Sequence, residues 1–505
     1  MLESTDFRKV ASGGFGDRHN SYAWSMAWFR DRLYVGTNRD IMWLFGKVGG
    51  HSYFDPFPVP LSPLAEMDLR AQIWRYSPAT KEWDRVYTSP LTTPSLRQAV
   101  KAHRATRVFP GRRPPKRWRL SNFMTRRRAR VLVREVLRLW LELARSGFKI
   151  AVGRDLGYRN IVVHTDAHGA ESMCVASVGA GGRLLRSTDG STFDMTPTFP
   201  IRALVSLKGR LFASSMRSDF SAYPGVLESE DPAGGATVAE SWRPASEPGF
   251  GDPENNLIFE MVAFNGHLYA GTTNRSGFQI WKANPEGTPP YRWKKVVGGG
   301  GYKGSPGPAM VLSMHPFGEW LYVGCGRTLS GRDVFDPSPG ELIRIAPDDT
   351  WEVIAGSGRE TDQGFKAPIS GLGAGFGNQL AMYVWRMETH GGWLYAGTND
   401  ATTFLRYTPK DRIGPQVARW VEQHGGVEKT LEAEAGFDLW RTQDGIRWTC
   451  VTRRGFDSPL HHGARTLQST PAGLFLGTAS NFFTDTTDPK TGQPGGGADI
   501  WLGAR

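Results

Sequence analysis

The stretch Leu268-Tyr-Ala-Gly-Thr272, followed by Ile280-Trp281 and Trp293, decides the fold, because the same phrase returns along the whole chain. Close copies begin at Leu33, Leu321, Leu394 and Leu474, and weaker copies are Leu211-Phe-Ala-Ser-Ser215 and Met173-Cys-Val-Ala-Ser177. In six copies a Met or Leu precedes the leucine by seven residues: Met26, Leu204, Met261, Met314, Met387 and Leu467. Repetition of this kind indicates a fold assembled from similar units.

Each unit contains four short apolar segments separated by turn residues, which is typical of four β-strands. The third segments centre on Ile73, Leu184, Val226, Ile280, Leu342, Leu439 and Ile500. The fourth segments begin at Trp83, Phe193, Trp242, Trp293, Trp351 and Trp448. A four-stranded sheet with two apolar faces cannot stand alone, and a radial arrangement buries those faces against neighbouring sheets. We therefore expect an all-β protein, one seven-bladed β-propeller domain over residues 1–505.

The two ends of the chain are expected to meet in one blade. The last unit, which ends Ala498-Asp-Ile-Trp-Leu502, has no fourth strand after it. Phe7-Arg-Lys-Val10 is similar to Trp293-Lys-Lys-Val296, the fourth strand of another unit. Residues 7–11 are therefore predicted to complete the last blade and close the ring. The alternative, two unrelated β-domains, is disfavoured because the repeat runs from end to end.

The loop that leads into a blade also repeats. Its copies are Gly14-Phe-Gly-Asp-Arg-His-Asn20, Gly249-Phe-Gly-Asp-Pro-Glu-Asn255, Gly375-Phe-Gly-Asn378 and the fainter Gly455-Phe-Asp-Ser458. Asp and Asn in such turns usually accept hydrogen bonds from nearby backbone N–H groups, so a structural role is favoured. A calcium site is the remaining alternative, although no dense acidic cluster supports it.

Together these motifs resemble a broad group of bacterial β-propeller proteins. Ser187-Thr-Asp-Gly190 and Thr442-Gln-Asp-Gly445 are similar to the aspartate-box turn of sialidase-like propellers, although both are one residue short of it. The resemblance covers nearly the whole chain except residues 97–149. It implies a fold rather than an activity, because propellers support many chemistries. Sialidases would also need a tyrosine–glutamate pair and an acid aspartate, and their usual ring has six blades.

Long insertions fall in loops that the strand order places on one face of the ring. They span residues 39–71, 326–340, 399–436 and 479–497. Loops that gather on one face commonly form the binding face. We therefore expect these loops to surround the mouth of the central channel, where a small anionic or aromatic ligand would bind. Tolerance of insertion anywhere in a loop is the alternative.

Charged residues occupy first-strand positions that should be small or apolar. One aligned position holds Trp24, Arg202, Phe259, Leu312, Trp385 and Arg465, and the next holds Ser25, Ala203, Glu260, Ser313, Arg386 and Thr466. An unpaired buried charge is costly. The arginines therefore either pair with Glu260 or clamp a ligand's carboxylate, sulfate or phosphate. The expected ligand-binding residues are Arg202, Arg386, Arg465, Trp24 and Trp385.

An enzyme that uses the same channel is the alternative function, of a hydrolase or lyase type. Its candidate catalytic residues are Glu260, Arg386 and His19, with a carboxyl or imidazole group as acid or base. His19, His461 and His462 are expected near one rim, where they either bind a metal or stand as exposed loop residues; no metal site is assigned and the cofactor is left unknown. The sequence contains no nucleophile elbow, zinc-protease helix or phosphate loop.

The net charge of +12 comes from one segment of the chain. Residues 97–149 contain 17 Lys and Arg against two acids, a charge of +15, whereas the rest has 44 basic and 47 acidic residues, or −3. The apolar spacing of Leu132, Val136, Leu143 and their neighbours predicts a helix over about 124–146. This insertion either packs on the propeller, lies on an anionic membrane surface or docks a protein partner. Nucleic acid is disfavoured, because the segment has no recognised binding motif.

Composition bears on the compartment. The chain has three cysteines, too few for a disulfide framework, and no stretch resembling a secretory signal or a transmembrane helix. We therefore expect a cytoplasmic protein, with peripheral membrane association open through residues 97–149. The oligomeric state is not indicated.

Overall fold

The computed structural model describes residues 1–40, 68–92, 152–179, 182–196, 198–215, 224–327, 334–480 and 495–505. Within these ranges the protein is mostly β, and its named strands pair antiparallel. The predicted basic insertion at 97–149 lies outside these ranges. Across the same ranges, no helix combines the length and apolar character needed to cross a membrane.

Antiparallel meanders of four strands recur along the chain, as the sequence repeat predicted. The first three are β2 (Asn20–Phe29), β3 (Arg32–Arg39), β4 (Gln72–Ser77) and β5 (Glu82–Thr88); β8 (Asp155–Thr165), β9 (Glu171–Gly179), β10 (Arg183–Ser187) and β11 (Asp194–Thr196); and β12 (Ile201–Leu207), β13 (Arg210–Ser215), β14 (Val226–Ser229) and β15 (Arg243–Pro244). The next are β16 (Asn255–Phe264), β17 (His267–Asn274), β18 (Ile280–Ala283) and β19 (Lys294–Val297); β20 (Met310–Phe317), β21 (Trp320–Gly326), β22 (Glu341–Ile345) and β23 (Trp351–Ala355); and β26 (Ala381–His390), β27 (Trp393–Asp400), β28 (Leu439–Thr442) and β29 (Thr449–Thr452). At the C-terminal end lie β30 (His461–Thr470), β31 (Gly473–Ser480) and β32 (Ile500–Gly503).

Short elements connect the meanders. Two small ribbons are β6 (Leu91–Thr92) with β7 (Val152–Gly153), and β24 (Arg359–Thr361) with β25 (Gly364–Lys366). The 3-10 turns are η1 (Ser4–Asp6), η4 (Pro248–Gly251), η5 (Gly299–Gly301), η6 (Ala374–Gly377), η7 (Thr402–Tyr407) and η8 (Lys410–Arg412). The α-helices are α4 (Val238–Ser241), α5 (Pro415–Gln423) and α6 (Val427–Glu434).

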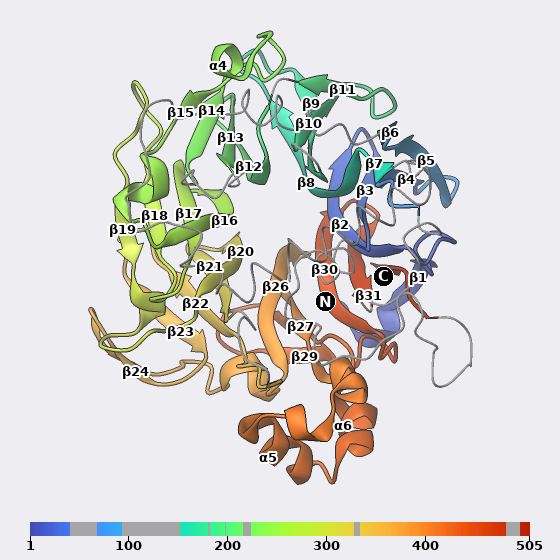
Figure 1. Cartoon of the computed structure of the whole chain (residues 1–505), viewed down its shortest axis with the longest axis vertical. Coiled ribbons are helices and arrows are strands. Elements are labelled where there is room, and N and C mark those ends of the chain that lie inside the picture. The colour runs from blue at the N-terminus through green and yellow to red at the C-terminus, as the bar shows by residue number, and fades with distance from the viewer. Residues whose placement is uncertain are drawn as a thin grey trace, which may run out of the picture.

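The N-terminal strand β1 (Phe7–Ala11) supplies the fourth strand beside β32. Phe7 pairs with Gly503 and Lys9 pairs with Trp501, so the pairing predicted for residues 7–11 is confirmed. The first strands lie next to one another in the order β2, β8, β12, β16, β20, β26 and β30, and β30 packs against β2. Figure 1 shows the sheets arranged around a common centre with these first strands innermost. The architecture is that of a β-propeller.

The repeated phrase builds the contact between neighbouring sheets. Its leucine and its aromatic or aliphatic residues are buried in the cores between sheets. Leu33 and Val35, for example, share a core with Phe475 and Ile500 of the sheet that contains β31 and β32. Its glycine lets the next first strand come close. A β-carbon added at Gly271 would lie 2.5 Å from Val311, and one added at Gly36 would lie 2.7 Å from Tyr158.

The insertion at 399–436 forms η7, η8, α5 and α6. Figure 1 shows α5 and α6 projecting at one end of the molecule. The apolar side of this segment shares a core with aromatic residues of the innermost strands, including Phe404 and Val417 from the insertion and Tyr22 and Trp24 from β2. The insertion is therefore packed onto the ring and does not stand free as a loop.

Candidate functional site

Every first strand carries a β-bulge at the same place. The register with the second strand shifts at Ala23/Ser25, Tyr158/Asn160, Ile201/Leu204, Ile258/Glu260, Val311/Ser313, Val384/Arg386 and Ala464/Thr466. A bulge leaves one residue unpaired and re-aims its side chain. The residues in these bulges are Trp24, Arg159, Arg202, Phe259, Leu312, Trp385 and Arg465. The first strands surround the centre of the ring, and the bulge arginines lie close enough for their charges to lower one another's pKa values.

Three bulge residues are arginines that stack on a bulge aromatic of an adjacent strand. The Cζ atom of Arg159 lies 4.5 Å from the ring centroid of Trp24, and that of Arg202 lies 3.5 Å from Phe259. Arg465 lies 5.1 Å from the ring of Trp385. Such cation–π contacts contribute about 0.5–2 kcal/mol each and fix the orientation of the guanidinium planes.

Arg202 and Arg465 are buried and Arg159 is half-buried, and the charge of Glu260 opposes the lowering of the pKa of Arg202 and of Arg465. Arg202 and Arg465 are 5% and 7% exposed, and the Nε atoms of Arg159, Arg202 and Arg465 are buried with no hydrogen-bond partner. Burial lowers the pKa of Arg159 and of Arg465 to about 9, with neighbouring arginines acting in the same direction. Burial, followed by the charge of Arg159, also holds the pKa of Arg202 well below its usual value. At neutral pH a group with a pKa near 9 is still a cation.

A fourth arginine, Arg386, is paired. Its Nη1 atom lies 3.6 Å from Oε1 of Glu260, and both residues directly follow a bulge, on β26 and β16. The interpretation of Glu260 as an ion-pair partner thus applies to Arg386. Among the described residues, one glutamate does not balance four arginines, and the resulting excess of positive charge is expensive in a partly desolvated setting.

A carboxyl group with a nearly neutral pKa lies on the same strand. Burial raises the pKa of Glu388 to about 7, although Arg386 opposes the shift. On β20, burial lowers the pKa of His315 to about 4, and its Nε2 atom lies 2.9 Å from Oγ1 of Thr389. A carboxyl group that titrates near pH 7 is suited to donate or accept a proton.

The two predicted tryptophans form an aromatic wall with Tyr22. Trp24 is 4% exposed and meets Tyr22 edge to face at 6.5 Å, and Trp385 meets Tyr22 at 5.8 Å. Phe404 of the insertion lies 5.6 Å from the ring of His462, which in turn lies 6.1 Å from Trp385. Trp24 is therefore buried, packs against Tyr22 and orients the guanidinium group of Arg159.

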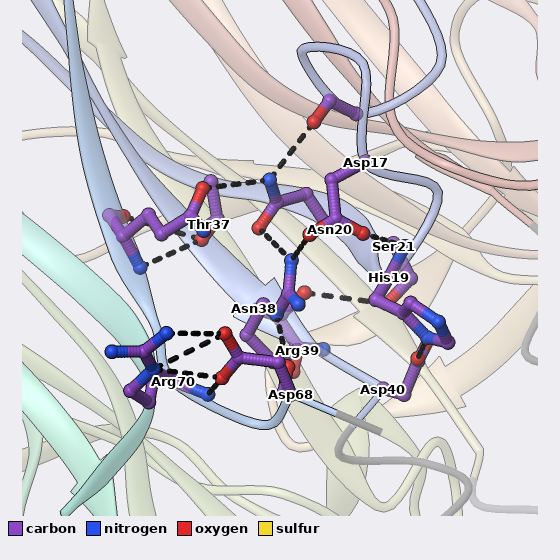
Figure 2. A network of polar contacts seen from close by, with 12 residues as sticks. Asp17, His19, Asn20, Ser21, Thr37, Asn38, Arg39, Asp40, Asp68 and Arg70 are labelled. Carbon is purple, nitrogen blue, oxygen red and sulfur yellow. Dashed lines mark hydrogen bonds and ion pairs between the residues drawn. The ribbon is translucent and has the colours of Figure 1, made fainter. Parts of the chain in front are cut away.

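The three predicted histidines each have a separate partner. The Nδ1 atom of His19 lies 2.7 Å from Oδ2 of Asp40 (Figure 2), and that of His461 lies 3.5 Å from Oδ2 of Asp499. His462 is fully buried with its Nε2 atom 3.3 Å from Oη of Tyr22, and burial lowers its pKa to about 3. In the part of the chain that the structure describes, no three His, Cys, Asp or Glu side chains group so that they could hold a metal ion.

The sequence prediction missed Arg159. In most units the core residue of the first strand pairs nine residues further on, as Met26 does with Val35, whereas Ile161 pairs with Val175. The β8–β9 hairpin is thus five residues longer and breaks the spacing that aligned the other strands. The sequence does contain a signal that could have identified Arg159, because Gly157-Tyr-Arg159 matches Gly463-Ala-Arg465. The structure gives the reason for the match: a β-carbon at either glycine would lie 2.2 Å from a tryptophan ring.

No protein-family model matches the sequence, and no curated protein matches it significantly. A comparison with solved structures matches an acylaminoacyl peptidase of Pyrococcus horikoshii, with 7% identity, 95% of this chain and 50% of that chain covered and a TM-score of 0.39. A prolyl endopeptidase has 9% identity, coverage of 97% and 52%, and a TM-score of 0.39. Bacteroides ovatus xyloglucan PUL GH43B has 13% identity, coverage of 38% and 40%, and a TM-score of 0.24. The chain spans about half the length of the two peptidases. At these levels of similarity, none of the three indicates what this protein binds or catalyses.

Proposed function

We propose that this protein is a seven-bladed β-propeller that binds a small anion in its central channel through Arg159, Arg202 and Arg465. The observation that carries the proposal is the excess of positive charge among the described residues. The Nε atoms of all three arginines are buried without a hydrogen-bond partner there, and Glu260, whose charge acts on Arg202 and Arg465, is paired with Arg386. A ligand with a carboxylate, sulfate or phosphate group would supply the missing acceptors through charge-assisted, bidentate hydrogen bonds.

The seven-bladed ring is supported by the order of the innermost strands and by β1. Each first strand packs against the next, and the last packs against β2, so the arginines of β8, β12 and β30 reach the centre from different directions. The pairing of β1 with β32 joins the chain ends within one blade. A ring closed in this way fixes the distances between the three arginines, so little conformational freedom is lost on binding.

An enzyme is the second candidate, and Glu388 favours it. A carboxyl group that titrates near pH 7 beside Arg386 could exchange a proton with a bound anionic substrate in a hydrolase or lyase type of reaction. We propose this role for Glu388 ahead of Glu260, because Glu260 is engaged by Arg386. If a substrate is turned over, Glu388→Gln should remove the limb of the pH–rate profile near pH 7, and an unchanged profile would exclude Glu388.

We further propose a cytoplasmic location and docking through residues 97–149. The three cysteines are free thiols, with Cys174 and Cys325 buried, which fits the reducing cytoplasm that the composition suggests. Docking of a protein or an anionic membrane through residues 97–149 is proposed on the charge of that segment, which lies outside the described residues.

Calorimetric titration tests anion binding. Sodium sulfate, phosphate and citrate are titrated into the wild type and into the triple variant Arg159→Met, Arg202→Met, Arg465→Met at low ionic strength. The triple variant should lose measurable binding, whereas the control Arg419→Met, which removes an exposed arginine of α5, should bind like the wild type. Equal binding by the triple variant would refute the proposal, and so would a wild type that binds none of the three anions.

A further inference from the structure

In each of the loops that lead into β2 and β16, the side-chain amide of one asparagine holds the loop to the sheet by hydrogen bonds. In the loop before β2 the Nδ2 atom of Asn20 donates to the carbonyl of Gly14 at 2.8 Å and to Oε1 of Gln72 at 3.0 Å, as part of the network in Figure 2. The loop before β16 repeats this with Asn255, which donates to Gly249 at 2.9 Å and to Gln279 at 2.9 Å. The amide nitrogen thus joins a loop carbonyl to the glutamine side chain at the start of the third strand.

The loop before β26 has the same backbone but lacks this amide. Gly375 has φ 63°, close to the 67° of Gly14 and the 61° of Gly249. Ala381 stands in register opposite Asp400 as Asn20 stands opposite Arg39 and Asn255 opposite Asn274. At the start of the third strand, Asp438 takes the place of Gln72 and Gln279. Where two other blades place a hydrogen-bond donor, this blade places a methyl group and two carboxylates.

Both carboxylates are completely buried, and one has no partner. Asp438 is 0% exposed, and neither of its carboxylate oxygens has a hydrogen-bond partner. Trp440 Nε1 is the nearest donor and lowers the pKa of Asp438, but it does not reach the hydrogen-bond geometry with which the equivalent Trp74 and Trp281 donate to their glutamines at 2.9 Å. Asp400, also 0% exposed, accepts hydrogen bonds from Thr402 and Asn378 only.

The charge of Arg453 opposes the raised pKa of Asp438, but within the described residues it does not form an ion pair with either aspartate. Neither Asp400 nor Asp438 forms a salt bridge there, and the nearby Arg453 is 3.3 Å from Glu434, which adds a further negative charge. Burial, reinforced for Asp438 by the charge of Asp400, raises the pKa of both carboxyl groups. Two buried carboxylates beside a carbonyl form an oxygen-lined place that a hard cation fills better than a neutral group does.

We propose that a divalent cation of the calcium type binds between Asp400, Asp438 and the carbonyl oxygen of Gly375, where the amide nitrogen of Asn20 or Asn255 lies in the other blades. Its two charges balance the two carboxylates, and water completes its coordination. Calcium fits better than magnesium because it accepts irregular sets of carboxylate and carbonyl oxygens. With only two carboxylates, affinity should be modest, with Kd on the order of 0.1–1 mM.

The cation would connect the two ends of the insertion at 399–436. Asp400 ends β27 one residue before η7 begins, and Asp438 directly precedes β28. Between them the insertion supplies Phe404, which packs into the aromatic core with Tyr22 and Trp24. The cation site is separate from the arginines of the channel, so it stands or falls independently of anion binding.

The test uses the full chain after dialysis against EDTA. Calcium chloride is titrated by calorimetry, and melting is followed with and without calcium, magnesium or sodium chloride. At about one hundred times Kd, calcium should raise Tm by about 2–3 °C, and magnesium and sodium should raise it less. An absence of calcium binding would overturn the proposal and would leave the two acids to hold protons.

A pair of variants tests the location of the cation. Ala381→Asn with Asp438→Gln copies the network of β16 to β18, so it should abolish the calcium response while melting no lower than the EDTA-treated wild type. Asp438→Asn alone should also abolish the response. The control Asp362→Asn removes an exposed carboxylate and should respond like the wild type. A full response in the double variant would exclude this site.

Discussion

Replacement of Arg202 by methionine should stabilise the protein when no anion is bound. Methionine keeps an unbranched side chain against the ring of Phe259 and removes only the charged head. Arg202 is 5% exposed, its Nε atom has no partner, and Arg159 adds repulsion. Glu260 offsets only part of this repulsion, so the substitution removes a charge whose burial is incompletely compensated.

The magnitude follows from two opposing contributions. Burial of a cation costs several kcal/mol after relaxation, and the contact between Arg202 and Phe259 at 3.5 Å returns up to about 2 kcal/mol. Arg202→Met should therefore raise the free energy of unfolding by about 1–3 kcal/mol. An unfolding entropy of about 2.1 cal/mol/K per residue gives about 1 kcal/mol/K for 505 residues, so Tm should rise by about 1–3 °C.

The assay is thermal melting in a low-salt buffer, with and without sulfate. At about one hundred times Kd an anion stabilises the wild type by about 2.7 kcal/mol and the variant by much less. The difference between the two melting temperatures should therefore shrink or change sign. Arg359→Met is the matched control, because Arg359 is equally buried but lies 3.0 Å from Glu341. Arg359→Met leaves Glu341 buried without its ion-pair partner, so it should lower the free energy of unfolding by about 3–5 kcal/mol. A clear fall in the Tm of Arg202→Met without anion would refute the reasoning.

Three further predictions concern single residues. The folded pKa of Glu388 is raised to about 7, so the contribution of this carboxyl group to stability is full below the unfolded pKa of 4.5 and is lost as pH rises through 7. Glu388→Gln should therefore have a higher Tm than the wild type at pH 8 but not at pH 4.5. Equal gains in Tm at both pH values would contradict this. Asn255→Ala removes two donated hydrogen bonds and one accepted from Asn274, so urea unfolding should show a loss of about 2–4 kcal/mol, against almost none for the exposed Glu254→Ala. Gly445→Ala would place a β-carbon 1.7 Å from Oη of Tyr322 at φ 75°, so it should lower Tm by several degrees. The control Gly373→Ala adds a β-carbon that meets nothing within 4 Å and should leave Tm unchanged. Equal changes in Tm for the two variants would argue against this contact.

Strand pairing was largely predictable from the sequence, because it depends on local alternation and on turn spacing. The phrase that includes Leu268 and Gly271 forms a second strand, as expected, and residues 7–11 pair with β32. The turn aspartates also behave as expected of structural residues. Asp17 accepts the N–H of His19 at 3.1 Å, and Asp189 accepts those of Ser191 and Thr192.

Alignment of the repeats placed Arg202, Arg386 and Arg465 at related positions but did not separate their roles. Pairing of Arg386 with Glu260 depends on how β16 and β26 approach the centre, and no local pattern encodes that distance. Arg159 was lost because the long β8–β9 hairpin breaks the spacing. Glu388 has no motif at all, since its raised pKa comes from burial in the assembled ring.

The sequence by itself therefore determined the repeating unit, the four strands of each meander and the strand that joins the two ends, because neighbouring residues decide these features. Only the tertiary structure decided which side chains meet. Arg159, Arg202 and Arg465 come from three strands far apart in the chain, and the bulge on each strand turns them to one centre. Asp400 and Asp438 lie on either side of a helical insertion and are brought together by the pairing of β27 with β28. Charges gathered in this way are costly unless a ligand compensates them, and that cost is where the function of this protein should be sought.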